Sequence, residues 1–203
     1  MTKMAKVLKN QPDEDYQLIN AFLGADLQAF DSLLLKYKNP IYHLCFQMIG
    51  NAQDAEDCAQ ETFIKAYRNL IKFKFESAFA TWLYRIAVNT CKNKLASAEY
   101  RAGKRFVRID KPFNSEEGVC RVEIPDQISP DVTFERKEIL LSIIKAVGTL
   151  PYDQKVLIVL RDFEGRSYEE IAKITGKKMG TIKSKLARAR EALRLKLKGV
   201  IQG

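Results

Sequence analysis

Helical periodicity fills both ends of this sequence and is interrupted in the middle, and this interruption constrains the fold more than any other feature. On either side of it, apolar residues recur at steps of three and four, and no stretch shows the alternation that a half-buried strand requires. Between Glu99 and Thr133 the periodicity is lost among prolines and glycines. A break of roughly 35 residues is too long for an ordinary connection inside a compact domain. We therefore expect an all-α protein with two small helical domains joined by a flexible linker.

The limits of the periodic segments set the expected organisation of the chain. We expect a flexible N-terminal tail over residues 1–12 and a first domain over residues 13–98. The flexible linker is expected over residues 99–133, and a second domain over residues 134–203. In the first domain the apolar spacing predicts helices over residues 13–23, 25–38, 40–48, 52–70 and 79–98. Pro40 is expected to open the third of these helices, because proline suits a first helical turn, and Gly50 is expected to close it.

Two features of composition bear on where the protein works. No apolar run approaches the roughly 18 residues needed to span a bilayer. Residues 1–11 contain scattered lysines but no apolar core of a signal peptide. We therefore expect a cytoplasmic protein without membrane insertion.

The cysteines and the single histidine show no pattern of a metal or disulfide site. Cys45, Cys58, Cys91 and Cys120 include no CxxC pair, and His43 is the only histidine. Because this spacing matches no known ligand set, we expect no metal and no cofactor. The first three cysteines are more simply interpreted as small apolar packing residues. With one histidine and no visible nucleophile–base pair, the chain is not expected to be an enzyme.

The net charge of +9 is concentrated near the C-terminus. The segment Arg166–Lys198 contains eleven basic and three acidic residues, which gives +8. A basic segment this short favours binding to a polyanion, because each phosphate contact releases condensed counterions. A solvated helix face is the alternative, since most charge runs are of that kind.

A helix-turn-helix is predicted inside this basic segment. Ser167 and Glu170 have the spacing of a capping box, which opens a short helix, and Gly176 is suited to end it. The longer helix that follows carries an apolar row at Ile182, Leu186, Ala189, Leu193 and Leu197. A capped short helix, a glycine turn and a longer basic helix together are typical of DNA-binding modules.

The outward side of the longer helix contains the candidate DNA-reading residues. Lys183, Ser184, Ala187 and Arg188 lie in its N-terminal half, where a recognition helix contacts base edges. Arginine and lysine can donate to guanine, and a small apolar side chain can lie near a thymine methyl group. An ordinary amphipathic hairpin with a lysine-rich exterior is the alternative.

A second candidate surface precedes the linker. On the last helix of the first domain, Arg85, Asn89 and Lys92 lie opposite the core, beside a loop rich in aromatic and cationic residues. Aromatic rings can stack on unpaired bases, and an amide can hydrogen-bond to a base that has left the stack. Pattern alone favours the alternative that Phe73 and Phe75 in this loop belong to the core.

Two blocks of the sequence resemble extracytoplasmic-function sigma factors of bacterial RNA polymerase. The first is similar to the second conserved region of that family and comprises Asp54–Asp57, Gln60–Tyr67 and Thr81–Asn89. The other is similar to the fourth region and comprises Leu150-Pro151, Gly165, Ser167–Ala172, Gly180–Leu186 and Arg188–Arg190. Both blocks have the family's order and spacing, and they are most similar to its envelope-stress, sigma-E type.

The resemblance implies a promoter-recognition subunit with three sets of contacts. The set expected to bind the clamp helices of the largest polymerase subunit consists of Asp57, Gln60, Glu61 and Ile64. The set expected to capture the single-stranded −10 element consists of Phe73, Lys74, Phe75, Ser77, Arg85, Asn89 and Lys92. The set expected to bind the duplex −35 element consists of Arg161, Tyr168, Thr181, Lys183, Ser184, Ala187 and Arg188. The polymerase flap region and an anti-sigma factor are further implied partners, and an envelope or stress regulon is the implied target.

Some positions depart from the family pattern. Asn93 stands where the family often has an acid, and Ala187 stands where histidine or an aromatic residue is common, which leaves the −35 base preference open. Trp82 is followed by Leu83, so the paired tryptophans of housekeeping sigma factors are absent. The alternatives are a stand-alone helix-turn-helix regulator that binds duplex DNA as a dimer, and a helical adaptor whose first domain binds only protein.

Overall fold

The structure is a computed structural model, and it describes residues 14–97 and 134–201. Every regular element in these two segments is helical, which confirms the all-α fold class. The expected tail, the expected linker and Cys120 lie outside the described residues. Within the same two segments, no helix is both long and apolar enough to cross a membrane.

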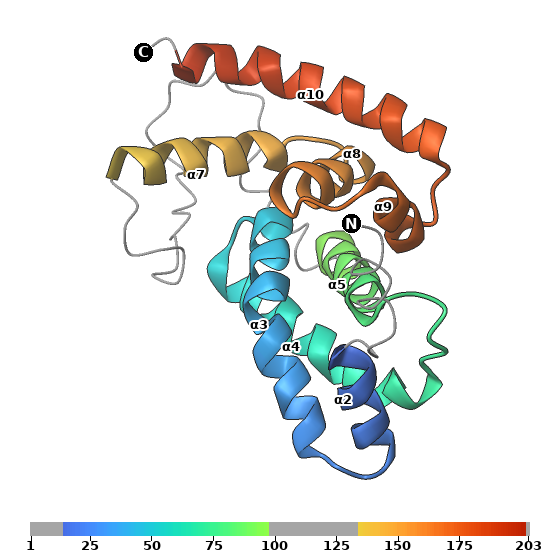
Figure 1. Cartoon of the computed structure of the whole chain (residues 1–203). Coiled ribbons are helices and arrows are strands. Elements are labelled where there is room, and N and C mark those ends of the chain that lie inside the picture. Colours follow the sequence, from blue (N-terminus) through green and yellow to red (C-terminus); the bar gives the residue numbers. More distant parts are fainter. Residues whose placement is uncertain (1–13, 98–133, 202–203) are drawn as a thin grey trace, which may run out of the picture.

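Helices α2 to α5 form the first helical unit, shown from blue to green in Figure 1. Its elements are α2 (Glu14–Leu23), α3 (Gln28–Ile49), α4 (Ala52–Asn69), the 3-10 turn η1 (Leu70–Lys72) and α5 (Phe79–Ala96). Helix α3 packs against α2, α4 and α5 and is the central helix of the unit. Gly50 ends α3 with a φ of 78° and donates its N–H to the Phe46 carbonyl, as its position predicts.

Pro40 does not open a helix as expected but lies inside the continuous helix α3. An interior proline loses one backbone hydrogen bond and clashes with the preceding turn, at a cost of about 3 kcal/mol. Burial on both sides offsets this cost, because Phe30 and Leu33 before the proline and Ile41 and Leu44 after it all belong to the core. Long-range packing therefore outweighs the local preference of proline.

Three cysteines from α3, α4 and α5 meet in the core of this unit. Cys45, Cys58 and Cys91 are free thiols and are almost completely buried. A hydrogen bond with Cys91, together with burial, raises the pKa of Cys58, and a hydrogen bond with Cys45 does the same for Cys91. Protonated thiols are poor nucleophiles. The environment therefore agrees with their interpretation as packing residues.

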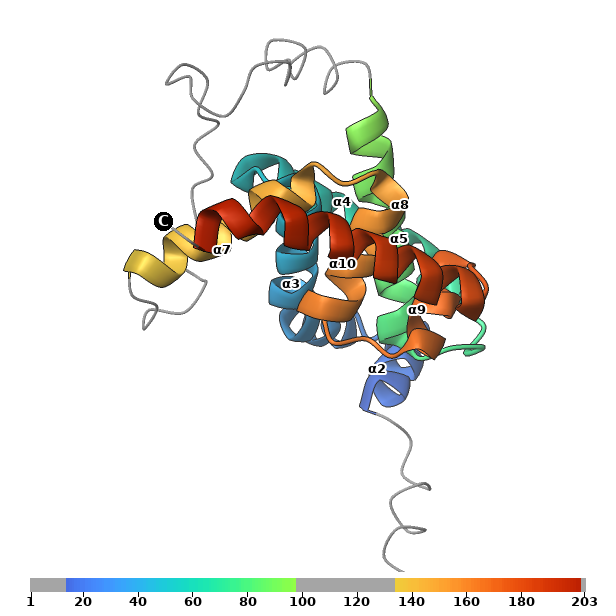
Figure 2. The ribbon, with the colours of Figure 1, turned by 90° about the horizontal axis from the view of Figure 1, so that it is seen from above.

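Helices α7 to α10 form the second unit, shown from yellow to red in Figure 1. Its elements are α7 (Phe134–Gly148), α8 (Tyr152–Ile158), the π-helical turn η2 (Val159–Phe163), α9 (Tyr168–Thr175) and α10 (Met179–Ile201). The long helix α10 packs across α7, α8 and α9, and Figure 2 shows it from above. Its buried residues Ile182, Leu186 and Ala189 form the predicted apolar row.

The two units pack against each other. Helix α9 lies on α5, while α7 and η2 lie on α3. Buried residues from both units belong to one continuous apolar cluster. The helices that carry the candidate DNA-reading faces, α5 and α10, therefore occur in one closed body.

The end of α2 places a non-glycine residue in the left-handed conformation. Ala25 has a φ of 76°, its N–H donates to the Phe22 carbonyl, and the N–H of Asp26 donates to the Ala21 carbonyl. These two bonds form a Schellman motif, in which the position of Ala25 is usually glycine. A Cβ atom in this conformation costs roughly 1–2 kcal/mol.

We expect Ala25→Gly to raise the free energy of unfolding by about 0.5–1 kcal/mol, because glycine adopts this φ without strain. Guanidinium titration followed by circular dichroism measures the change. Ala187→Gly is the matched control, since it removes the same methyl group from the exposed interior of α10. The control should lower stability by about 1 kcal/mol. A loss of stability in Ala25→Gly would contradict the assigned strain.

Candidate nucleic-acid interface

Helices α9 and α10 form the predicted helix-turn-helix. The N–H of Glu170 donates to Ser167 Oγ at 3.1 Å, and the N–H of Ser167 donates to Glu170 Oε2 at 2.8 Å, which confirms the capping box. The backbone hydrogen bond from Ser167 holds the pKa of Glu170 below its usual value. Gly176 ends α9 in the left-handed conformation with a φ of 69°. The chain can therefore turn directly into α10.

The N-terminal half of α10 has one buried and one exposed side. The exposed side chains include those of Thr181, Lys183, Ser184, Ala187 and Arg188. All five belong to the set expected at the −35 element, and the structure brings them together on one helix. Because Ile182 and Leu186 are anchored in the core, this face keeps a fixed orientation relative to α9.

The other two residues of this set meet the helix at its side. The guanidinium of Arg161 lies 4.8 Å from the centre of the Tyr168 ring, and Lys183 Nζ lies 5.7 Å from the same centre. Arg161 also donates to the Arg166 carbonyl at 2.8 Å. A cation over an aromatic face is attracted by the ring quadrupole. The ring of Tyr168 therefore contacts two of the cations expected to bind DNA, Arg161 and Lys183.

Several basic residues of the segment are engaged in internal ion pairs. Asp153 of α8 accepts from Lys185 at 2.5 Å and from Lys177 at 3.2 Å, and the Lys185 bond is the main cause that lowers the pKa of Asp153. Asp162 of η2 pairs with Arg190 in the same way. These pairs hold α10 against α8 and η2. They also show that the formal charge of the segment overstates its free charge.

The polar stripe that Arg85, Asn89 and Lys92 form on α5 is exposed but lies at the boundary with the second unit. Arg85, Asn89 and Lys92 are all exposed, at the predicted steps of four and three. Arg85 Nη2 donates to the backbone carbonyl of Lys173 in α9. The stripe therefore borders on the helix-turn-helix instead of facing open solvent along its whole length.

The loop before α5 divides its two phenylalanines between core and surface. Phe73 is only 8% exposed, and its ring packs against those of Phe79 and Trp82, so the structure places it in the core. Phe75 is 39% exposed and has a φ of 57°, which is strained for a bulky residue. Lys74 is exposed and Ser77 is half-buried in the same loop.

Tyr16 of α2 is a neighbour of this loop that the sequence analysis missed. Its ring lies 5.0 Å from the ring of Phe75, and about half of its surface is exposed. The two residues are almost 60 positions apart on the printed sequence, so no local pattern connects them. Together they form an exposed aromatic pair at the loop that precedes α5.

The outward face of α4 contains the set expected to contact the polymerase. Its members Asp57, Gln60, Glu61 and Ile64 are all exposed. Glu61 pairs with Lys65 at 2.7 Å, and Asp57 lies 3.7 Å from Lys94. Beyond Ile64, which is 50% exposed, Tyr67 and Ile71 also present large apolar surfaces to solvent. The step of three from Ile64 to Tyr67 and the step of four from Tyr67 to Ile71 could have indicated this extension.

Comparisons with known protein families match both units. The description "Sigma-70 region 2" matches residues 33–100, and "Sigma-70, region 4" matches residues 140–193. The RNA polymerase sigma-H factor of Pseudomonas aeruginosa is 40% identical over 183 residues, covering 89% of this chain and 92% of the relative. The ECF RNA polymerase sigma-E factor of Escherichia coli is 37% identical over 188 residues, covering 93% and 96%.

Solved structures show the same arrangement of helices. The sigma factor RpoE of Bartonella quintana, solved in complex with the anti-sigma factor NepR, has a TM-score of 0.61 and 27% identity, covering 85% of this chain and 98% of that one. CnrH, solved with the cytosolic domain of CnrY, has a TM-score of 0.66 and 21% identity, covering 92% and 99%. Two family regions in sequence order, with relatives matched over almost their whole length, show that the chain belongs to the extracytoplasmic-function branch of the sigma-70 family of RNA polymerase sigma factors.

Proposed function

We propose that this sigma factor binds core RNA polymerase and directs it to promoters, reading duplex DNA at −35 with α10 and an unpaired −10 strand with α5 and the preceding loop. The observation that carries the proposal is that one chain presents two exposed polar faces at the places matched by regions 4 and 2. An apolar row anchors each face in the core. Catalysis belongs to the polymerase, and no chemical step is assigned to this chain.

The contact with the polymerase is proposed for the exposed face of α4. Asp57, Gln60 and Glu61 supply polar groups, while Ile64 of α4 and Ile71 of the following turn η1 supply apolar surface. A patch with an apolar centre and a polar rim is typical of a protein–protein interface. We assign this face to the clamp helices of the largest subunit, and the second unit to the flap region.

The −10 contact is proposed for the α5 stripe and the aromatic pair of Tyr16 and Phe75. Exposed rings can stack on bases that have left the duplex, while Asn89 offers an amide that both donates and accepts. The strained backbone of Phe75 supports this assignment, because strain of this kind clusters at binding sites. Phe73, in the core below, is assigned to support of the loop.

The −35 contact is proposed for the exposed side of α10 and the neighbouring cations. Arg188 and Lys183 are placed to reach base edges or phosphates in the major groove. Arg161 and Tyr168 are assigned to the DNA backbone, beside the recognition helix. This division separates the residues that read the base sequence from the residues that fix the position of the protein on the DNA.

Regulation by an anti-sigma factor is proposed from the relatives. RpoE was solved with the anti-sigma factor NepR, and CnrH with the cytosolic domain of CnrY. We propose that a comparable protein restrains this chain until an envelope or stress signal releases it. The cytoplasm, where core polymerase works, is the proposed location.

Run-off transcription with core polymerase and genomic fragments tests the function. We expect discrete transcripts only when both the polymerase and this chain are present, and their start sites locate the −10 and −35 sequences. Tight binding of the chain alone to duplex DNA, without effect on the polymerase, would support the stand-alone regulator instead.

We expect Gln60→Ala with Glu61→Ala to weaken binding to core polymerase about tenfold, because both side chains are exposed on the proposed interface. Fluorescence anisotropy of the labelled chain measures the affinity. The control is Glu14→Ala with Gln17→Ala, which truncates the same residue types at exposed positions on α2. Equal affinity of both double variants would reject the α4 face.

Asn89→Ala is expected to relax the −10 preference, since alanine cannot replace the hydrogen bonds of the amide to a captured base. The expected cost is about 1–3 kcal/mol in open-complex formation. Permanganate footprinting on promoters with −10 substitutions measures it, with core affinity as the check on folding. Asn93→Ala, an exposed amide one turn further along α5, is the control. If Asn89→Ala discriminates −10 substitutions as well as the unmodified chain does, Asn89 is only a structural residue.

Arg188→Ala is expected to lower promoter selectivity at −35 by about 1–3 kcal/mol, if its guanidinium reads a base with two hydrogen bonds. Competition between the promoter and a version with a scrambled −35 sequence measures this loss in the holoenzyme. Arg194→Ala removes an exposed arginine six residues further along α10 that pairs with Glu191, and it should leave selectivity unchanged. Equal losses on both DNAs would assign Arg188 to phosphate.

A further inference from the structure

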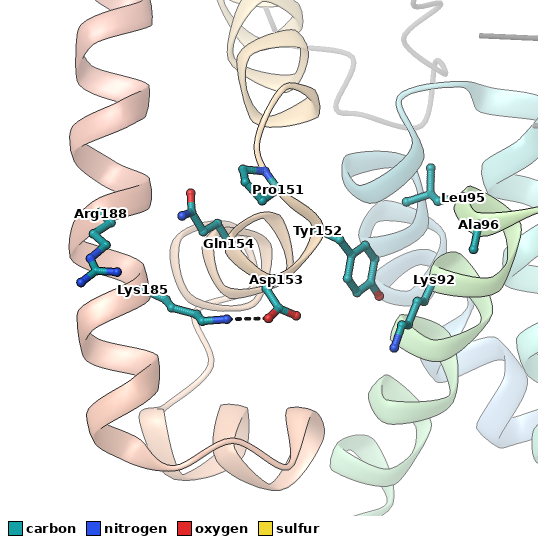
Figure 3. Close-up of a pocket in the computed structure, with 9 residues that line it drawn as sticks. All are labelled: Lys92, Leu95, Ala96, Pro151, Tyr152, Asp153, Gln154, Lys185 and Arg188. Atoms are coloured by element: carbon teal, nitrogen blue, oxygen red, sulfur yellow. Dashed lines mark hydrogen bonds and ion pairs between the residues drawn. The ribbon is translucent and has the colours of Figure 1, made fainter. Parts of the chain in front are cut away.

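Asp153 of α8 is an acidic residue that packs against the basic helix-turn-helix. Its Oδ2 atom accepts a hydrogen bond from Lys185 Nζ at 2.5 Å and another from Lys177 Nζ at 3.2 Å. Lys177 lies in the turn between α9 and α10, and Lys185 lies in α10 itself. Figure 3 shows the Lys185 side chain extending from α10 to the carboxylate. One acidic side chain therefore binds two cations of the motif.

Lys185 lies at the edge of the face of α10 that is proposed to read DNA. It follows Thr181 by four residues and precedes Arg188 by three, and side chains at these steps are neighbours on a helix surface. Lys185, Asp153 and Arg188 line the same open cleft, which Figure 3 shows. A lysine at the edge of a recognition helix is placed to contact the phosphates beside the bases that are read. Lys185 is in position for such a contact, but Asp153 occupies its ammonium group.

The other two cations in this half of α10 have no carboxylate partner in the described part of the chain. Lys183 Nζ lies 5.7 Å from the centre of the Tyr168 ring, and Arg188 takes part in none of the ion pairs of the second unit. The bond to Asp153 therefore distinguishes Lys185 from the cations that are assigned to DNA.

The ion pairs of Asp153 are too exposed to be important for stability. The side chains of Lys177, Lys185 and Asp153 keep 27%, 32% and 46% of their surfaces exposed. Pairs of this kind contribute little to folding, because water screens them and because ordering two long side chains costs entropy. The hydrogen bond from Lys185 lowers the pKa of Asp153, so the carboxylate is ionised at neutral pH. The main effect of this carboxylate is therefore on the charge that the motif presents to DNA.

A DNA phosphate and Asp153 compete for the same ammonium group of Lys185. A lysine that neutralises a phosphate releases condensed counterions, which is the source of sequence-independent affinity. A lysine that already pairs with a carboxylate must first leave that pair, and the freed carboxylate then repels the phosphates nearby. Lys177 binds the same oxygen atom and keeps the carboxylate in place. These effects lower the affinity for duplex DNA of any sequence, and none of them alters a hydrogen bond to a base.

We propose that Asp153 limits the affinity of this sigma factor for duplex DNA by holding Lys185 away from the phosphate backbone. The charge of Asp153 sets how tightly α10 is held on any sequence, while Arg188 and its neighbours set which sequence is preferred. A recognition helix with fewer phosphate contacts depends more on base contacts and on the polymerase for stable binding. This role of Asp153 rests on the proposed use of α10 at the −35 element.

Salt titration of holoenzyme binding to a duplex that carries only the −35 element tests this role. Asp153→Asn keeps the shape and the oxygen acceptor of the side chain and removes its charge. We expect the variant to bind about tenfold more tightly at about 100 mM salt, because one further phosphate contact forms. The slope of log K against log salt concentration should become steeper by about one. A duplex with a scrambled −35 sequence should show the same gain, so the preference between the two duplexes should not change.

Two further variants show whether the released lysine causes the effect. Glu191→Gln is the matched control, since it removes the same charge from the ion pair with Arg194, six residues beyond Lys185 on α10. It should leave the slope unchanged. Asp153→Asn with Lys185→Gln should return the slope to that of the unmodified chain. Lys185→Gln alone should leave the slope unchanged, because Asp153 already withholds this lysine from DNA.

The outcomes separate the role of Asp153 from a purely structural one. An unchanged slope in Asp153→Asn would overturn the proposal, as would an equal change in Glu191→Gln or a steep slope that persists after Lys185→Gln is added. If circular dichroism shows that Asp153→Asn loses helix content, Lys185→Gln alone decides. A shallower slope in that variant would show that Lys185 contacts phosphate despite Asp153, whereas an unchanged slope supports the proposal.

The same titration distinguishes this role from the proposed function. If the unmodified holoenzyme binds the −35 and scrambled duplexes equally, the assignment of α10 to the −35 element fails. The change of slope in Asp153→Asn still tests the competition for Lys185 in that case, because phosphate contacts do not depend on sequence.

Discussion

The burial of α3 along its whole length is the constraint on which the other elements depend. This helix contacts α2, α4 and α5 in its own unit, and also α7 and η2 in the other. It remains unbroken at Pro40, because both of its halves belong to the core. As a result, the outward face of α4 and the polar stripe of α5 are fixed to one central helix. The second unit docks on the same helix, so both units share a common frame.

Features that depend on neighbours in sequence could be predicted, whereas those that depend on distant packing could not. The capping box at Ser167, the end of α3 at Gly50 and the buried row of α10 each follow from local chemistry, and all are present. Pro40 does not open a helix as its local preference predicts, because burial of α3 on both sides of the proline outweighs that preference. The pattern of the loop before α5 favoured burial of both of its phenylalanines. Phe73 is buried as expected, but Phe75 is exposed.

The candidate site was predicted well where one helix face carries it, and poorly where several elements meet. The exposed residues of α10 were visible from periodicity, but the contact of Tyr16 with the loop joins distant parts of the chain. Charge counting was similarly limited. Lys185 and Arg190 contribute to the formal charge of the C-terminal segment, yet acidic residues of α8 and η2 neutralise them. Composition cannot distinguish such internal pairs from charge that is available to DNA.

The position of Tyr168 has a consequence for the entropy of DNA binding. Free arginine and lysine side chains sample many rotamers, and ordering them on DNA costs roughly 0.5–1.5 kcal/mol for each. Arg161 and Lys183 already lie against one aromatic ring, so part of their freedom is lost when the protein folds. A cation that is ordered before the encounter gives up less entropy on contact with a phosphate. The tyrosine thereby shifts an ordering cost from the binding step to the folding step, where burial of the core offsets it.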